Sequence, residues 1–200
     1  MPTPTGRRAV LACDSVVALV SRMRTTIFDT ALGAFGIGWT DAGIARLQLP
    51  GLDPAALLQR INRDGAAPGE PTNAIEAVIN RIEDYAEGEA VEFNDLQLDL
   101  EGQPAFHLEA YQLLLQTRWG QTTTYGAMAR QLGDVALSRA AGQAMGANPI
   151  PLIIPCHRVL ASAGKPGGFS APGGAQSKLR MLALEGVAVG APAGQMAFGF

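Results

Sequence analysis

Hydrophobic spacing divides the chain into a strand-rich first half and a helix-rich second half. Alternating β-formers occupy residues 25–32, 35–40 and 43–49, and the short segments Gly33-Ala34 and Asp41-Ala42-Gly43 separate them. Runs of this length with glycine-containing connections predict a three-stranded meander with tight turns. We therefore expect a small antiparallel sheet early in the chain.

Two helices and a further strand are predicted after this sheet. Residues 54–64 have helical spacing with Asp53 as N-cap and Pro54 at the first position. A second apolar stripe begins at residue 72 or 73 and ends at residue 87. Residues 91–100 alternate imperfectly and predict a strand with a bulge near Asn94-Asp95. The carboxylates of this half are scattered, so we expect it to provide structural support.

The second half has helical periodicity. An apolar stripe covers residues 104–118, and Thr122-Thr123-Thr124 supplies an N-cap for a helix over 125–132. A second helix is predicted over 135–145, and two short helices joined by a glycine-containing turn are typical of a helix-turn-helix. Small residues surround Arg139 in this second helix. That composition fits either close packing against a neighbouring element or entry into a DNA minor groove.

The short apolar run 148–155 leads directly to Cys156. Its β-branched residues and bounding prolines predict a buried strand that presents Cys156 at a bend. A free thiol, with a pKa of about 8.5, reacts as its thiolate, and the adjacent His157 or Arg158 could raise the thiolate fraction. Neighbouring side chains on a straight strand point to opposite faces, so contact between Cys156 and His157 requires a bend or a bridging water. The alternative is a packed core cysteine.

Composition is that of an ordinary globular chain. Its 200 residues are 48% hydrophobic and 16% charged, which suffices for one large or two small domains. Two cysteines, Cys13 and Cys156, and two histidines, His107 and His157, are too few and too scattered for a disulfide framework or a metal site. We expect no bound metal, and a reducing, cytoplasmic setting suits a free thiol.

Charge is distributed unevenly along the chain. Residues 1–100 hold 8 Lys/Arg against 14 Asp/Glu, whereas residues 101–200 hold 7 against 4. The second half can therefore present a local DNA-facing surface with few phosphate contacts. Residues 9–20 faintly resemble a signal peptide, but Asp14 interrupts them and they are too short to span a bilayer. We expect no membrane association and treat residues 1–22 as an extension.

The string NPIPLIIPCHRV at 148–159 resembles the active-site signature of the O6-alkylguanine-DNA alkyltransferases, also called methylated-DNA-protein-cysteine methyltransferases. Tyr-Gly, Arg-Ala-x-Gly, Gly-Phe-Ser and Leu-Glu-Gly motifs extend the resemblance over 111–186, and it is looser over 25–100. It implies an α+β two-domain protein, with an N-terminal ribonuclease-H-like α/β domain and a mostly helical, winged-helix-like C-terminal domain containing the helix-turn-helix. The expected divisions are an extension at 1–22, a structural domain at 23–103, a DNA-binding and active-site domain at 104–190 and a tail at 191–200.

The resemblance also implies a reaction. It is DNA repair by irreversible transfer of an alkyl group from O6-alkylguanine, with O4-alkylthymine as a second candidate lesion, in duplex DNA to Cys156. A monomer acts once and needs no cofactor. The implied catalytic residues are Cys156 as nucleophile, His157 as proton acceptor through water, Glu185 as its orienting carboxylate, Tyr125 as proton donor toward the base and Asn148 as a brace.

Other positions follow from the same resemblance. The implied DNA-binding residues are Thr124, Tyr125, Arg139, Ala140, Gly142 and Gln143, of which Arg139 fills the space left by a flipped base. The implied substrate-binding residues are Arg158, Val159, Phe169 and Ser170. This chain departs from the family pattern at Tyr111, Arg118, Ala141 and Phe169, and Phe169 replaces a tyrosine that could hydrogen-bond guanine.

Two other functions compete with this interpretation. A non-catalytic lesion-binding module would flip the base without reacting, but such relatives lack the cysteine that this chain keeps at position 156. A cysteine hydrolase would need a distant histidine, for which His107 is the candidate.

Overall fold

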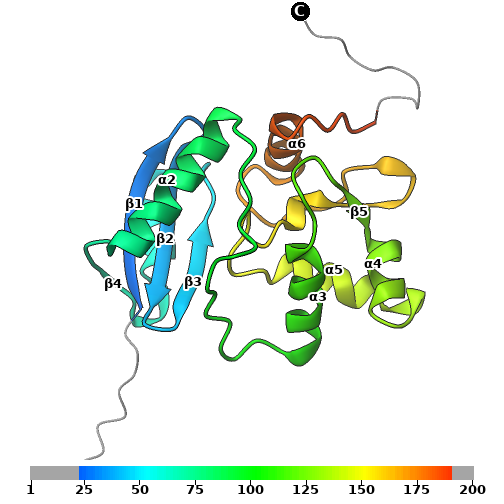
Figure 1. The fold of residues 1–200 in the computed structure, drawn as a ribbon, viewed down its shortest axis with the longest axis horizontal. Coiled ribbons are helices and arrows are strands. Elements are labelled where there is room, and N and C mark those ends of the chain that lie inside the picture. Colours follow the sequence, from blue (N-terminus) through cyan, green and yellow to red (C-terminus); the bar gives the residue numbers. More distant parts are fainter. Residues whose placement is uncertain (1–22, 191–200) are drawn as a thin grey trace, which may run out of the picture.

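The computed structural model describes residues 23–190, and the predicted extension and tail lie outside them. A four-stranded sheet with the order β3-β2-β1-β4 forms one side of the molecule (Figure 1). Its strands are β1 (Arg24–Thr30), β2 (Gly33–Thr40), β3 (Gly43–Gln48) and β4 (Ala67–Pro68). The three predicted strands are confirmed and pair antiparallel. The sheet is nevertheless mixed, because β4 pairs parallel with β1.

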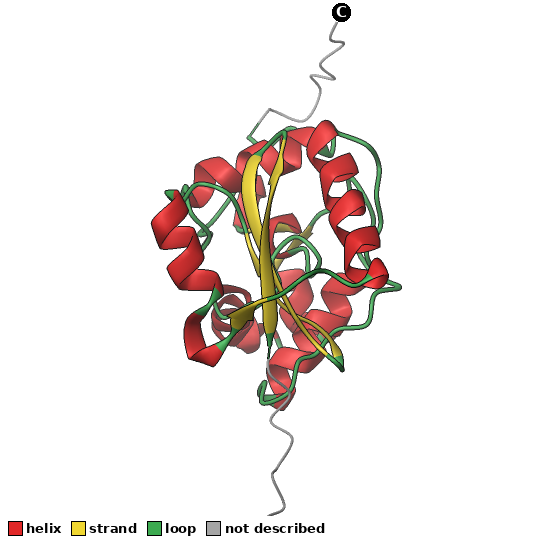
Figure 2. Ribbon diagram, turned by 90° about the vertical axis from the view of Figure 1, so that its left-hand side faces the viewer, coloured by secondary structure: helices red, strands yellow, loops and turns green. Residues whose placement is uncertain are grey.

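Helices α1 (Pro54–Ile61) and α2 (Asn73–Glu87) cover opposite faces of this sheet (Figure 2). Asp53 caps α1 as predicted, but the helix ends three residues early because Asp64 adopts φ 62° within the 3-10 turn η1 (Arg63–Gly65). A Cβ at Gly36 would lie 3.0 Å from Ile61, so glycine in β2 allows α1 to pack closely. The bounds predicted for α2 are confirmed.

The strand predicted over 91–100 is wrong. Residues 94–96 form a turn closed by Leu96 N–H donating to the Phe93 carbonyl at 3.3 Å, and Arg81 of α2 holds Asp95 at 2.8 Å. Within this segment only Leu98 forms a bridge, with Ile44 near the start of β3. The alternating side chains therefore follow an irregular segment that packs against the core at isolated positions.

The other side of the molecule is mostly helical. It contains α3 (Ala105–Leu115), α4 (Tyr125–Gln131), α5 (Ser138–Gly146) and α6 (Gly174–Leu184). The predicted helix-turn-helix pair corresponds to α4 and α5, but α5 begins three residues late because a separate 3-10 turn, η2 (Val135–Leu137), precedes it. Asp134 caps η2 by accepting from Ala136 N–H at 2.8 Å. Strands β5 (Thr123–Thr124) and β6 (Val159–Leu160) form a short parallel pair, and η4 (Ser162–Gly164) follows β6.

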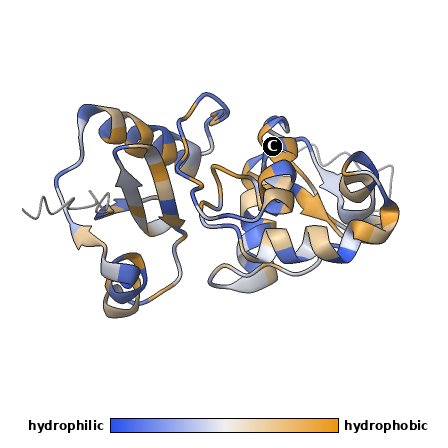
Figure 3. Ribbon diagram, turned by 90° about the horizontal axis from the view of Figure 1, so that it is seen from below, coloured by the Kyte–Doolittle hydropathy of each residue, from blue (hydrophilic) through white to orange (hydrophobic). Residues whose placement is uncertain are grey.

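One hydrophobic cluster extends through both sides of the molecule, which lie next to each other in Figure 3. It includes Ile37 and Trp39 of β2, Ile82 of α2, and Tyr111 and Leu114 of α3. Leu47 N–H of β3 also donates to the Pro149 carbonyl at 3.0 Å, which ties the sheet to the segment before Cys156. Among residues 23–190, none of the helices is long and apolar enough to cross a membrane.

Candidate active site

The segment before Cys156 is a compact turn, so the strand predicted there is wrong. Asn148 holds it at both ends, because its Nδ2 donates to the Ile154 carbonyl at 2.8 Å and its Oδ1 accepts from Ile150 N–H at 3.0 Å. Leu152 adopts φ 80°, an uncommon conformation for a non-glycine residue. Three prolines lack the N–H groups that a continuous ladder needs, and the chain bonds to itself instead. They are Pro149, Pro151 and Pro155.

Cys156 begins the 3-10 helix η3 (Cys156–Arg158) directly after this turn. The backbone therefore bends at Cys156, as contact between Cys156 and His157 would require, and His157 does not continue an extended strand. Cys156 is 4% exposed and lines two cavities. The thiol is therefore buried yet open to an occupant of either cavity, which distinguishes it from a packed core cysteine.

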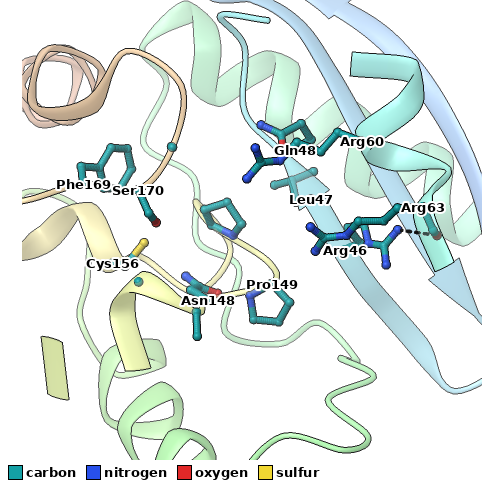
Figure 4. A pocket seen from close by; sticks show the side chains of 14 residues that line it. Arg46, Leu47, Gln48, Arg60, Arg63, Asn148, Pro149, Cys156, Phe169 and Ser170 are labelled. Carbon is teal, nitrogen blue, oxygen red and sulfur yellow. Dashed lines mark hydrogen bonds between the residues drawn. The ribbon is translucent and has the colours of Figure 1, made fainter. Parts of the chain in front are cut away.

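The first cavity, of about 310 Å³, lies between α4, α5 and the 168–170 loop. Its lining is mostly apolar or glycine, with Tyr125, Met145, Phe169 and Ser170 contributing side chains beside Cys156. The second cavity, of about 240 Å³, separates the turn from the sheet. Figure 4 shows it with Cys156, Phe169 and Ser170 on one side. Its opposite wall carries Arg46, Leu47, Gln48, Arg60 and Arg63.

Burial raises the pKa of the Cys156 thiol. A hydrogen bond involving Asn148, the positive charge of Lys178 and the backbone N–H groups at Cys156 and His157 oppose this increase without cancelling it. This result differs from the sequence expectation that the neighbouring His157 or Arg158 would lower it. The isolated site therefore holds mainly neutral thiol at neutral pH.

His157 and Glu185 form a fully buried pair, with Nε2 and Oε1 2.7 Å apart. Burial and the charges of Arg158 and Lys178 lower the pKa of His157, and Glu185 only partly opposes them. Burial would raise the pKa of Glu185, but bonds and charges from His157 and Arg158 hold it at about 2. The pair is therefore a neutral imidazole donating to a carboxylate. In residues 23–190 the other ring nitrogen, Nδ1, is buried without a hydrogen-bond partner, and its lone pair is free to accept a proton.

Arg158 lines neither of the two cavities, so the structure gives no support to its predicted substrate contact. Its Nε and Nη2 donate to the two carboxylate oxygens of Glu185 at 2.9 and 3.1 Å, and its Nη1 donates to the Thr117 carbonyl at 2.6 Å. The side chain is 4% exposed. A buried bidentate ion pair of this kind satisfies the charge of Arg158 inside the protein.

Lys178 is a cation near the thiol that was not predicted from the sequence. It is fully buried in α6, and its Nζ donates to the Val159 carbonyl at 2.5 Å and lies 5.9 Å from the centre of the Tyr125 ring. Burial lowers its pKa, and Cys156 opposes that shift. The spacing of Lys178, Met181, Leu182 and Glu185 could have revealed it, because positions i, i+3, i+4 and i+7 share the buried face of a helix.

The remaining predicted positions lie around the first cavity. Tyr125 begins α4 with its ring half-buried beside Cys156, and burial followed by the charge of Cys156 raises its pKa. Thr124 caps α4 by accepting from Ala127 N–H at 3.1 Å, so its hydroxyl is already engaged. Gly142 lines the cavity, whereas Arg139 and Gln143 are exposed on α5 and Ala140 is half-buried. Val159 is fully buried, and its carbonyl accepts from Lys178.

The structure thus defines a mixed α+β protein with a buried thiol beside an imidazole-carboxylate pair. The sequence model of the 6-O-methylguanine DNA methyltransferase DNA-binding domain matches residues 105–187. A methylated-DNA-protein-cysteine methyltransferase of Mycolicibacterium paratuberculosis is 35% identical over 150 residues, covering 72% of this chain and 88% of the relative. The mouse protein of that name is 29% identical over 188 residues, covering 88% of each chain.

A solved structure of Mycobacterium tuberculosis OGT in complex with DNA has a similar fold. Its TM-score is 0.68 at 30% identity, over 82% of this chain and 93% of that one. The similarity covers both the sheet and the helical side of the molecule. The chain belongs to the methylated-DNA-protein-cysteine methyltransferase family.

Proposed function

We propose that this protein repairs DNA by transferring the alkyl group of O6-alkylguanine in a duplex, with O4-alkylthymine as a second lesion, directly to Cys156. The observation that carries this proposal is the position of the thiol at the floor of a cavity, adjacent in sequence to a buried imidazole-carboxylate pair. The similarity to an OGT solved with DNA supports the same substrate class.

The reaction is a displacement at a saturated carbon. The sulfur of Cys156 forms a bond to the alkyl carbon while the bond from that carbon to guanine O6 breaks, and its electron pair stays with the base. The thiol loses a proton and the departing guanine gains one, so the balance closes without a cofactor. The product is a thioether that water does not hydrolyse, so each molecule acts once.

His157 accepts the thiol proton in this proposal. Its Nε2–H donates to Glu185, which leaves the Nδ1 lone pair as the acceptor, and a water molecule relays the proton from Cys156 to it. Glu185 holds the tautomer and orientation of the ring. Asn148 fixes the turn that carries the thiol. Lys178 places a positive charge near the developing thiolate and so favours its formation.

The base reaches this site by leaving the duplex. Arg139, exposed on α5, inserts into the base stack, and Tyr125 at the start of α4 directs the flipped nucleotide and donates a proton toward it. Phe169, Ser170 and Gly142 enclose the base in the first cavity. Gln143, Thr124 and Ala140 complete the DNA-facing surface around these helices.

We further propose that residues 23–103 form a ribonuclease-H-like structural domain and residues 104–190 a winged-helix-like domain. The mixed sheet with helices on both faces supports the first assignment, and the α4-α5 pair next to the β5-β6 ribbon supports the second. The protein acts as a cytoplasmic monomer in this proposal.

Intact-protein mass spectrometry tests the function directly. Incubation with a duplex containing O6-methylguanine should add one methyl mass to the peptide that contains Cys156, and Cys156→Ser should abolish the addition. The control duplex carries unmodified guanine. A folded wild-type sample whose mass stays unchanged after prolonged incubation would overturn the proposal.

A further inference from the structure

Tyr85 connects the sheet-bearing side of the molecule to the imidazole-carboxylate pair. It lies in the last two turns of α2 and is fully buried. Its hydroxyl donates to Glu185 Oε1 at 3.2 Å, the same oxygen that lies 2.7 Å from His157 Nε2. Its ring also meets the His157 ring edge-on, with centroids 6.4 Å apart. From its sequence, this part of the chain was expected to provide only structural support.

The position of the Tyr85 hydroxyl has an electrostatic consequence. Glu185 Oε1 accepts from Tyr85, from His157 and from Arg158 Nη2, while Oε2 accepts from Arg158 Nε and from Gly120 N–H. A hydroxyl that donates to Oε1 withdraws charge from the oxygen that His157 uses. It therefore limits how strongly Glu185 can stabilise a protonated imidazole, and it adds a further bond that holds the carboxylate in place.

We propose that Tyr85 is a positioning residue for alkyl transfer, whose hydroxyl orients Glu185 and keeps His157 a neutral proton acceptor. This inference rests on the proposed function. The titratable or charged side chains that act on His157 and Glu185 within residues 23–190 are Tyr85 from α2, Arg158 from η3 and Lys178 from α6. Arg158 and Lys178 act in the same direction as Tyr85, because both positive charges disfavour a protonated His157.

Tyr85→Phe tests the proposal because it removes the hydroxyl and keeps the ring, which packs against Trp119 with centroids 5.3 Å apart. Without the hydroxyl, Oε1 becomes the stronger acceptor and the protonated imidazole is favoured. In a plot of the alkyl-transfer rate against pH, the acid limb should shift to higher pH by about half a unit. At a given pH on that limb, the reaction is then about threefold slower. Thr25→Val is the matched control. Thr25 lies in β1, and its buried hydroxyl also donates to a side-chain oxygen, Oδ1 of Asn62, which the substitution leaves without this donor.

Histidine NMR gives a readout that does not depend on alkyl transfer. The chain contains two histidines, so ¹⁵N-histidine spectra report His157 with His107 as an internal reference. Tyr85→Phe should shift the His157 signals and their titration, and it should leave the positions of the His107 signals unchanged. Should Tyr85→Phe fail to fold, 3-fluorotyrosine at position 85 keeps the hydroxyl, makes it a stronger donor and should move the acid limb downward.

The outcomes separate this inference from the proposed function. If the wild-type protein is not alkylated, the proposed function fails, whatever the spectra show. If the wild-type protein is alkylated while both the acid limb and the His157 titration of a folded position-85 variant match those of wild type, the positioning role is overturned. A shift of equal size in Thr25→Val would also overturn it, because any lost buried hydroxyl would then have the same effect.

Discussion

Glu185 stands 28 residues after His157 in the chain, yet its carboxylate lies 2.7 Å from the imidazole and fully inside the protein. The residue follows the last turn of α6, and its neighbour in the ion pair, Arg158, comes from η3. Three charged or titratable side chains, those of His157, Arg158 and Glu185, thus bond to one another inside the protein. Several measurable consequences follow from this burial and from the contacts around it.

The stability of the protein should fall on both sides of neutral pH. The pKa of His157 is lowered in the folded state, so below about pH 6.5 the unfolded chain binds a proton that the native protein does not, and stability decreases. The pKa of Cys156 is raised, so above about pH 9 the unfolded chain loses a proton that the native thiol keeps, and stability decreases again. Urea unfolding between pH 5 and pH 10 measures both slopes.

Two variants assign these slopes to their residues. Cys156→Ser should flatten the alkaline slope, and His157→Gln should flatten the slope just below neutrality. The stabilisation from the low pKa of Glu185, about 2, is lost only further down, as the pH falls from about 4.5 toward that value. An alkaline slope that persists unchanged in Cys156→Ser would show that another group causes it.

Asn148→Ala should weaken both folding and alkyl transfer. The substitution removes two side-chain bonds that hold the turn before Cys156, to the Ile154 carbonyl and from Ile150 N–H. Because it leaves buried backbone groups unpaired, we expect a loss of about 2–3 kcal/mol in the free energy of unfolding. Urea unfolding gives this value, and single-turnover mass spectrometry gives the rate. A wild-type unfolding midpoint would contradict the bracing role of Asn148.

Lys178→Met should separate stability from activity. Among residues 23–190 the ammonium group has a single hydrogen-bond partner, the Val159 carbonyl, and burial lowers its pKa. A methionine of similar length should therefore cost little stability or even increase it. Loss of the positive charge should raise the pKa of the Cys156 thiol further and slow alkyl transfer at least several-fold at neutral pH. The thiol pKa can be followed by thiolate absorbance near 240 nm in a Cys13→Ser background. Equal rates for variant and wild type would exclude an electrostatic role for Lys178.

Arg139→Ala should impair the reaction with duplex DNA and spare the reaction with a free base. The side chain is exposed on α5, away from the buried thiol, so its proposed role is limited to extruding the nucleotide. We expect about a tenfold slower transfer from an O6-methylguanine duplex and an unchanged rate with O6-benzylguanine. Arg130→Ala is the control, since Arg130 is an exposed cation in the last turn of α4. Equal losses in both variants would point to general charge, not to base flipping.

Periodicity predicted the elements whose structure depends on local residues. The turns around Gly33 and Gly43 are short enough to place β1, β2 and β3 correctly, and the cap at Thr72 and the apolar stripe together define α2. The strand predicted over residues 91–100 did not form, although the side chains alternate there. The apolar side chains of this segment pack against the core one at a time, and Asp95 forms an ion pair with Arg81 of α2. Long-range contacts decide such segments, and spacing along the chain does not record them.

The candidate site was predicted unevenly for a similar reason. Cys156, Asn148 and the His157-Glu185 pair lie where the signature and the closing motif suggested, whereas Arg158 turned out to be bound to Glu185. Adjacency to Cys156 implied that Arg158 acts on the thiol, but the 3-10 turn points it away. The contribution of Tyr85 could not be foreseen at all, because it depends on how α2 packs against α6.

The raised pKa of Cys156 bears on how long an unused molecule survives in the cell. Thiolates react with peroxides and disulfides far faster than thiols do, and a neutral sulfur that is 4% exposed is therefore a poor nucleophile toward them. A protein that is consumed by its first alkylation loses its entire capacity if it is oxidised beforehand. Keeping the sulfur protonated until a lesion fills the cavity therefore preserves each copy for the one event it can perform.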